Sequence, residues 1–285
     1  MTRYDYHRPS SLAEAHALKA EIGDARFIAG GTDLMIRVRD KEVRPKALIS
    51  LRNVAGLAGV TMAGGGARIG AATTIADIAR HAELGRAFPV LVEAAGRVGG
   101  PAVRNAGTVG GNLCNASPCA DTALPLLVLD ARLAIEGPRG GREIPLAELF
   151  RGPRSTSLAP DEIVTAVIVP APAPGARAAF LKKGRVKMDL SLASVAVLLE
   201  LDGDTCATAR VAAGSVAPTP IRLPAAEALL AGRRLTDDVV AAAAEAAMQG
   251  VSPITDVRST AEYRRQIVGV YLRRAVLGLR GGVTA

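Results

Sequence analysis

The chain contains 285 residues and carries 35 Lys and Arg against 27 Asp and Glu, a formal net charge of +8. This length is sufficient for two or three lobes with separate cores. The composition excludes two classes of protein. Four Phe, four Tyr and no Trp cannot build a stacking platform for single-stranded nucleic acid, and no apolar run reaches the roughly 18 residues that a membrane-spanning helix needs. The first seven residues lack the apolar core of a signal peptide, so we expect a cytoplasmic protein.

The N-terminal part of the chain alternates between helical and extended patterns. The predicted elements are a helix over 12–21, a strand over 27–29, a helical segment over 34–38 and a strand over 46–51. Such alternation is typical of an α/β arrangement. We therefore expect a first lobe over residues 1–57.

A second lobe is expected over residues 58–175. Its predicted elements are strands over 60–62 and 67–71 around a glycine turn, helices over 75–82 and 88–98, and a strand over 126–136. Between the last helix and the last strand, residues 105–122 are small and show no periodicity, which predicts a loop. A loop of this length is uncommon in a compact domain unless it binds something.

The Pro-rich segment 170–175 predicts a linker, after which the pattern changes. A hairpin is expected over 191–213, followed by helices over 225–230, 237–248 and 261–279. We therefore expect a third unit over 176–285. The predicted fold class is α+β, with a two-lobed α/β region followed by a C-terminal domain of sheet and helices.

Two glycine segments are the best candidates for a functional site. Residues 29–34 follow a predicted strand and open a helical segment, and residues 107–113 have the same mixture of Gly, Thr and short polar side chains. Successive backbone N–H groups in such a segment can form a concave nest for phosphate oxygens. Gly permits this because it accepts a positive φ and lets a ligand approach the backbone. The same composition in 64–66 is interpreted as an ordinary turn.

The sequence contains no other recognisable motif for catalysis. Neither glycine segment fits G-x-G-x-x-G or a P-loop, and no metal spacing, nucleophile elbow or distinctive carboxylate pair occurs. Three Cys residues at unhelpful spacings predict small buried side chains, with neither a disulfide framework nor a metal site. We therefore assign no catalytic residue and no metal ligand, and we favour an anionic cofactor that carries the chemistry itself.

These segments resemble a known family. Residues 29–34 (Ala-Gly-Gly-Thr-Asp-Leu) and 108–113 (Thr-Val-Gly-Gly-Asn-Leu) resemble the two FAD-binding motifs of the medium, flavoprotein subunit of molybdenum hydroxylases, the carbon monoxide dehydrogenase and xanthine dehydrogenase type. Further similarity lies in the opening Tyr-His-Arg-Pro at 6–9, and in 116–122, 214–220 and 263–265. The resemblance extends in order over essentially the whole chain.

The resemblance implies an FAD-binding region of the PCMH type, with FAD between the two lobes and its diphosphate on the glycine motifs. It places Asp121 near the adenosine end of FAD and Lys182 near the flavin. The implied cofactor-binding residues are Ala29, Gly30, Gly31, Thr32, Asp33, Leu34, Gly107, Thr108, Val109, Gly110, Gly111, Asn112, Asp121 and Lys182.

The resemblance also implies partner subunits. Electrons would pass from a large subunit with a molybdenum–pterin cofactor, through a small subunit with [2Fe–2S] clusters, to this FAD and on to an external acceptor. The implied assembly is a dimer of heterotrimers, a heterohexamer. Some relatives hold an additional [4Fe–4S] cluster in a four-cysteine insertion, and we expect none in a chain with three Cys.

Two other functions stay open at this point. One is a stand-alone FAD-dependent oxidase or reductase, which would be active without partner chains. The other is a basic, non-enzymatic binding protein for nucleic acid or acidic partners, since a positive net charge attracts anions. Because the basic residues occur in small groups, we interpret them mainly as a solvated surface.

Overall fold

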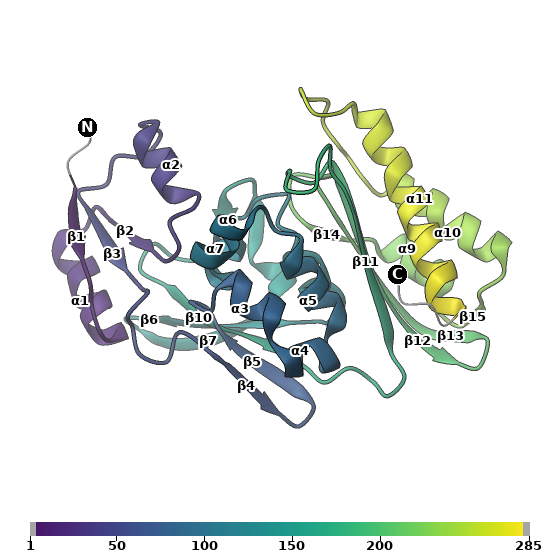
Figure 1. Cartoon of the computed structure of the whole chain (residues 1–285), viewed down its shortest axis with the longest axis horizontal. Helices are drawn as coiled ribbons and strands as arrows, with labels where there is room; N and C mark the ends of the chain where they lie inside the picture. The colour runs from purple at the N-terminus through teal and green to yellow at the C-terminus, as the bar shows by residue number, and fades with distance from the viewer. Residues whose placement is uncertain (1–3, 282–285) are drawn as a thin grey trace.

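In the computed structural model, which describes residues 4–281, three sheets with their helices follow one another along the long axis (Figure 1). The predicted ends of the first and last units, residues 1–3 and 282–285, lie outside the described residues. Helix and sheet are mixed throughout, so the predicted fold class is confirmed.

The first unit is a small parallel sheet with strand order β1-β3-β2. Its helix α1 begins where the Ser11 hydroxyl accepts the Glu14 N–H at 3.2 Å, as expected for an N-cap. The carboxyl ends of all three parallel strands meet at one edge, and the first glycine segment follows directly after β2 at that edge. The elements are β1 (Asp5–His7), α1 (Leu12–Ile22), β2 (Ala25–Ile28), α2 (Leu34–Arg39) and β3 (Ala47–Ser50).

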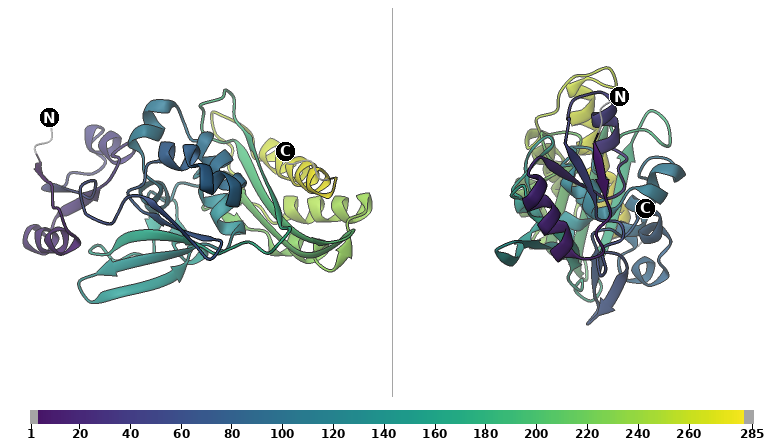
Figure 2. Two further views of the ribbon diagram at one scale, coloured as in Figure 1. Left: turned by 60° about the horizontal axis from the view of Figure 1, so that its bottom comes forward. Right: turned by 90° about the vertical axis from the view of Figure 1, so that its left-hand side faces the viewer.

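The second unit is an antiparallel sheet of order β4-β5-β10-β6-β7, with short helices packed on one face (Figure 2). Its main core lies between this face and the helices. The strands are β4 (Val60–Ala63), β5 (Gly66–Gly70), β6 (Arg132–Gly137), β7 (Gly140–Pro145) and β10 (Ile163–Val169), with the small pair β8 (Phe150–Gly152) and β9 (Ser155–Thr156) beside them. The helices are α3 (Ile75–Arg80), α4 (Ala82–Ala87), α5 (Pro89–Gly96), α6 (Pro101–Ala106), α7 (Val109–Cys114), α8 (Ala123–Val128) and the single turn η1 (Leu146–Glu148).

Two predictions for this unit are wrong. The predicted loop over 105–122 contains the end of α6 and all of α7, because the Thr108 hydroxyl caps a new helix at the Gly111 N–H. The predicted strand over 126–136 is instead the end of α8 followed by β6. Every residue of α8 is buried, and a short apolar run that is buried on all sides has no period that separates helix from strand.

The C-terminal unit is a sheet of order β11-β12-β13-β14 whose outer face is covered by α9, α10 and α11 (Figure 1). Its other face packs against α5 and α8 of the second unit. The predicted hairpin is confirmed as β12 and β13, and the three predicted helices are confirmed. The elements are β11 (Arg177–Lys183), β12 (Ala193–Asp202), β13 (Thr205–Gly214), β14 (Ile221–Arg222), α9 (Pro224–Leu230), β15 (Arg233–Arg234), α10 (Asp237–Gln249) and α11 (Ala261–Arg280).

Strand β12 is buried on both faces, which explains its continuous apolar sequence. Val195, Val197 and Leu199 belong to the core under α10 and α11. Ala196 and Leu198 point the other way, into the core of the second unit. Alternate residues of a strand face opposite sides of the sheet, so this one strand joins the two cores. Of the helices over residues 4–281, none has the length and apolar character needed to cross a membrane.

Candidate cofactor-binding site

A cleft of about 460 Å³ lies where the three units meet. Twelve of the fourteen predicted site residues line it, although they come from four separate stretches of the chain. They are Ala29, Gly30, Gly31, Thr32, Asp33, Leu34, Gly107, Thr108, Gly111, Asn112, Asp121 and Lys182. Val109 and Gly110 do not line this cleft, and their assignment as cofactor-binding residues stays a prediction.

The first glycine segment presents a row of backbone donors. Within residues 4–281, the N–H groups of Gly30, Gly31, Thr32, Asp33 and Leu34 have no hydrogen-bond acceptor. Gly31 has a φ of +72°, which turns the chain from β2 into α2. A series of unused donors around such a turn forms a concave site for an anion, because each N–H carries a partial positive charge.

The two glycine segments touch each other across the lobes. A Cβ atom on Gly30 would collide with the carbonyl oxygen of Ala106 and would lie 2.7 Å from the Cα of Gly107. This contact admits only a residue without a side chain. The close approach places the donors of the first segment directly beside the start of α7.

The second glycine segment uses its backbone donors inside the protein. The N–H of Val109 donates to the Thr73 carbonyl at 3.0 Å, and the N–H of Gly110 donates to the Ala71 carbonyl at 2.9 Å. The N–H of Gly111 is taken by the hydroxyl of Thr108 at 3.0 Å. The prediction of a second backbone nest like the first is therefore wrong for these three groups.

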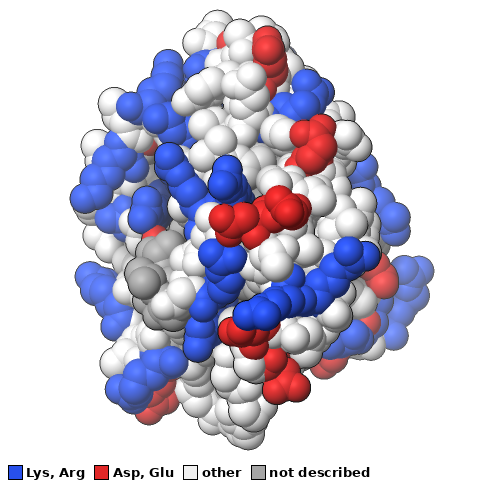
Figure 3. All heavy atoms as spheres, turned by 90° about the vertical axis from the view of Figure 1, so that its right-hand side faces the viewer, with Lys and Arg blue, Asp and Glu red and all other residues white. Residues whose placement is uncertain are grey.

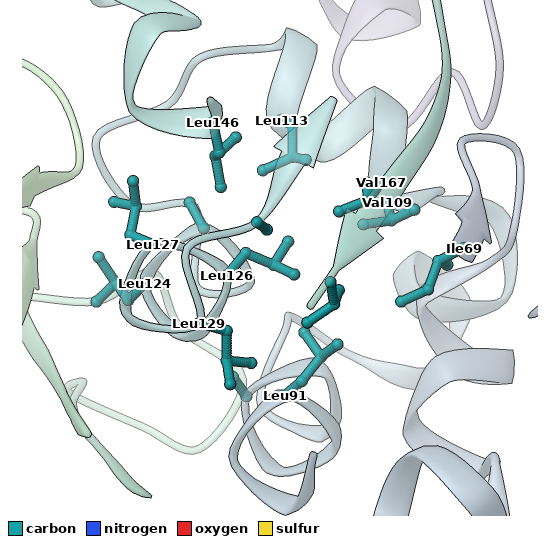
Figure 4. Packing of buried hydrophobic residues seen from close by; sticks show 14 of the residues in the cluster. Ile69, Leu91, Val109, Leu113, Leu124, Leu126, Leu127, Leu129, Leu146 and Val167 are labelled. Carbon is teal, nitrogen blue, oxygen red and sulfur yellow. The ribbon is translucent and has the colours of Figure 1, made fainter. Parts of the chain in front are cut away.

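Instead, the second segment packs into the core through α7 and forms part of the cleft wall. Val109 and Leu113 of α7 are fully buried in the main core, and Figure 4 shows Val109 next to Val167 of β10. A Cβ on Gly110 would lie 2.6 Å from the Cβ of Ala71, so this glycine serves the packing of α7 against the chain after β5. The opposite side of α7 is left facing the cleft.

Asn112 lies on that cleft side with a fixed orientation. Its Oδ1 accepts a hydrogen bond of 2.7 Å from the Thr122 hydroxyl, and Thr122 is fully buried. Because the carbonyl oxygen of the amide is occupied, the Nδ2 group is the part left to donate to a ligand. The sequence indicated Asn112 as a cofactor-binding residue, and the structure shows that the Thr122 hydroxyl orients its amide.

Asp121 and Lys182 form a buried ion pair in the cleft wall. The Lys182 Nζ lies 2.6 Å from Asp121 Oδ2 and also donates to the Arg97 carbonyl at 2.9 Å, and both charged side chains are only 5% exposed. The structure thus brings Asp121 and Lys182 into direct contact. The expectations that Asp121 lies near the adenosine end of FAD and Lys182 near the flavin stay predictions.

The other oxygen of Asp121 has no partner. Oδ1 is buried and accepts no hydrogen bond from the described residues. Burial raises the pKa of Asp121 to about 6, although the neighbouring Lys182 ammonium acts in the opposite direction. An unpaired buried acceptor costs free energy, so this oxygen is suited to accept a donor from a bound molecule.

Several residues that line the cleft were not predicted from the sequence. Gly100 was not predicted as a site residue, yet it lines the cleft beside Met188. Cys114 and Cys119 also line it, whereas Cys206 is fully buried as expected. Burial raises the pKa of the Cys114 thiol to about 12, which favours its neutral form. No local pattern marks these residues, because distant segments bring them together.

The fold and the donor set define a flavoprotein of the two-lobed FAD-binding class. A family model described as the FAD binding domain in molybdopterin dehydrogenase matches residues 2–172, and one described as the CO dehydrogenase flavoprotein C-terminal domain matches residues 178–279. The chain belongs to the family of FAD-binding medium subunits of molybdenum hydroxylases, and it is an oxidoreductase subunit. The predicted family is thus confirmed.

Individual relatives are similar in sequence to this chain over nearly its whole length. The putative xanthine dehydrogenase FAD-binding subunit of Escherichia coli K12 is 36% identical over 274 residues, covering 95% of this chain and 94% of the relative. The carbon monoxide dehydrogenase medium chain of Hydrogenophaga pseudoflava is 34% identical over 275 residues, covering 96% of each. The solved carbon monoxide dehydrogenase of that organism, in a form lacking the Mo-pyranopterin moiety, superimposes with a TM-score of 0.96 at 34% identity over 99% of both chains.

Proposed function

We propose that this chain holds FAD in the cleft and passes electrons from iron–sulfur clusters of a partner subunit to an external acceptor. One observation carries the proposal: the five unused N–H groups of 30–34 and the unpaired Oδ1 of Asp121 line the same cleft. FAD offers the matching groups, an anionic diphosphate for the donors and N–H or O–H groups for the acceptor.

In this proposal the residues of the chain bind and orient the cofactor. The N–H groups of 30–34 donate to the diphosphate, and the amide of Asn112 adds a side-chain donor. Asp121 Oδ1 accepts a hydrogen bond from the cofactor, while Lys182 keeps the carboxylate charged and in place. FAD itself, when bound, supplies the capacity to take up electrons and release them to a second partner.

The proposed partners are a large subunit with a molybdenum–pterin cofactor and a small subunit with [2Fe–2S] clusters, arranged as a dimer of heterotrimers. The names of the relatives support such an assembly, since they are a medium chain and an FAD-binding subunit of larger dehydrogenases. We further propose a cytoplasmic location, and unit boundaries that divide the chain into 1–57, 58–175 and 176–285.

The test is to purify the chain together with the chains that accompany it in its source, and to record its absorption spectrum. We expect about one flavin per chain, bleached by a reducing substrate of the complex. Colourless protein that takes up no added FAD, even with its partners, would refute the proposal. Turnover of a substrate by the isolated chain would favour the stand-alone oxidase or reductase.

The alternative of a basic binding protein has weaker support. On the end of the molecule formed by the C-terminal unit, Asp and Glu side chains lie among the Lys and Arg side chains (Figure 3). Many Arg side chains are also paired, for example Arg280 with Asp237. A surface of alternating sign does not form the continuous positive stripe that a nucleic acid requires.

A further inference from the structure

Arg37 is a charged residue of the cleft wall that has no role in the function proposed above. It lies in the last turn of α2, the helix that follows the first glycine segment on the side of the first unit that faces the second unit (Figure 1). It lines the cleft together with Asp33 and Leu34, which precede it by one helical turn on the same face. The cation is therefore one turn away from the unused N–H groups of 30–34.

The geometry of a helix directs the Arg37 side chain back toward these donors. Side chains of an α-helix are tilted toward its N-terminus, so a long side chain covers the residues three and four positions earlier. For Arg37 these residues are Leu34 and Asp33, and one helical turn is a rise of only about 5 Å. An extended arginine side chain spans this rise, so the guanidinium can reach an anion that is bound at the N–H groups.

The guanidinium of Arg37 also has an unused donor. Its Nε is buried and donates no hydrogen bond within residues 4–281. Glu42 Oε2 lies 3.5 Å from this nitrogen, which is an ion-pair distance, but the two atoms do not form a hydrogen bond. A buried donor without an acceptor costs free energy, so an oxygen atom of a ligand would stabilise it.

Glu42 compensates only part of the positive charge of Arg37. The same Oε2 atom accepts a hydrogen bond of 2.7 Å from Nη1 of Arg154, which lies in the turn between β8 and β9 of the second unit. One carboxylate is thus shared by two guanidinium groups, and its shorter contact is with Arg154. Arg37 therefore contributes positive charge to the cleft wall that a bound anion can neutralise.

We propose that Arg37 is a further cofactor-binding residue whose guanidinium pairs with the diphosphate of FAD, and that Glu42 weakens this contact by competing for the same guanidinium. The inference rests on the proposed function. A guanidinium suits this role because it stays charged and presents several N–H donors to phosphate oxygens. The backbone donors of 30–34 position the anion, and Arg37 adds a full positive charge beside it.

The experiment measures FAD affinity for the variants Arg37→Gln and Glu42→Gln, by quenching of flavin fluorescence during titration of the flavin-free protein. Each variant has a matched control with the same change of net charge: Arg39→Gln, on the same helix, and Asp40→Asn. Arg39 and Asp40 pair with each other at 3.0 Å, and neither of them lines the cleft. Urea unfolding of each variant shows whether the fold is retained.

We expect Arg37→Gln to bind FAD about 10-fold more weakly than Arg39→Gln, because it lacks a hydrogen bond to a charged group at a partly exposed position. Its FAD affinity should also depend less on salt concentration, since one screened charge contact is missing. Glu42→Gln should bind FAD about 3-fold more tightly than Asp40→Asn, because the competing carboxylate is gone.

Equal FAD affinity of Arg37→Gln and Arg39→Gln would overturn the inference. Weaker binding of FAD by Glu42→Gln than by Asp40→Asn would also overturn it, since Glu42 would then support the site through Arg154 and would not compete for Arg37. A wild-type protein that takes up no FAD would instead refute the proposed function, so the two failures are distinguishable.

Discussion

Replacing Gly30 by alanine should separate the two lobes and weaken cofactor binding. The added Cβ would overlap the carbonyl group of Ala106 and would lie 2.7 Å from the Gly107 Cα, about 1 Å inside an ordinary contact. These are backbone atoms that cannot rotate away, so the lobes must move apart by a similar distance. Forced overpacking of this kind costs about 1–3 kcal/mol of folding free energy.

The same displacement moves the donors of 30–34 relative to Asn112 and Asp121. A hydrogen bond of 2.9 Å that lengthens by about 1 Å is lost, and a bond to a charged group contributes about 1.5–3 kcal/mol. We therefore expect FAD affinity to fall about 10- to 100-fold, measured by quenching of flavin fluorescence during titration of the flavin-free protein.

Gly85→Ala is the matched control, because a Cβ there meets no atom within 4 Å and the residue lies in α4. It should leave FAD affinity unchanged and raise the free energy of unfolding by about 0.5–1 kcal/mol, since alanine favours a helix. If Gly30→Ala bound FAD with wild-type affinity and unfolded at the wild-type denaturant concentration, the argument for a sterically required contact would be refuted.

Three more predictions concern single side chains of the same site. The pKa of Asp121 in the folded state, about 6, is higher than in the unfolded state, so the folded state binds the proton more tightly and the free energy of unfolding falls as the pH rises through 6. In urea unfolding, the flavin-free protein should lose about 1 kcal/mol of this free energy between pH 5 and pH 7. The variant Asp121→Asn should not show this loss. Leu113→Ala removes a fully buried anchor of α7 and should cost about 2–5 kcal/mol in the same assay, and a smaller loss would mean that the helix repacks. Thr108→Ala removes the N-cap of α7 and should lower the free energy of unfolding by about 1 kcal/mol. Thr74→Ala removes the N-cap of α3, and Thr74 does not line the cleft. This second variant should lose a similar free energy of unfolding but bind FAD normally.

Local signals were sufficient for much of the fold. The helices α1, α10 and α11 begin at Ser11, Thr236 and Thr260, each of which caps through its hydroxyl. Their lengths and polar faces distinguish them from strands. The hairpin of β12 and β13 was equally clear, because a turn sequence separates two long apolar runs.

The wrong secondary-structure predictions concern segments that are buried on all sides or that consist mainly of small residues. The predicted strand over 126–136 covers the end of α8 and then β6, because the fully buried residues of α8 have no period that distinguishes a helix from a strand. The boundary lies at Asp130, where φ is +52°. In α7, small residues without periodicity predicted a loop. Packing of Val109 and Leu113 into the core, which no local window contains, stabilises the helix there.

Hydrogen bonds to neighbouring segments explain why the two similar glycine motifs have different roles. In the first motif the donors of 30–34 are unused because the segment runs past the end of β2 with no neighbouring strand to receive them. In the second motif, Thr73 and Ala71 of the chain after β5 take the donors of Val109 and Gly110. The neighbouring segment of the chain therefore decides whether the backbone N–H groups of each motif are free to bind an anion. The second motif contributes through what it positions: Gly107 against Gly30, and Asn112 toward the cleft. A change at Val109 or Gly110, which do not line the cleft, should therefore weaken cofactor binding only through the loss of stability. A change at Gly31, where φ is +72°, should weaken binding by more than the stability loss.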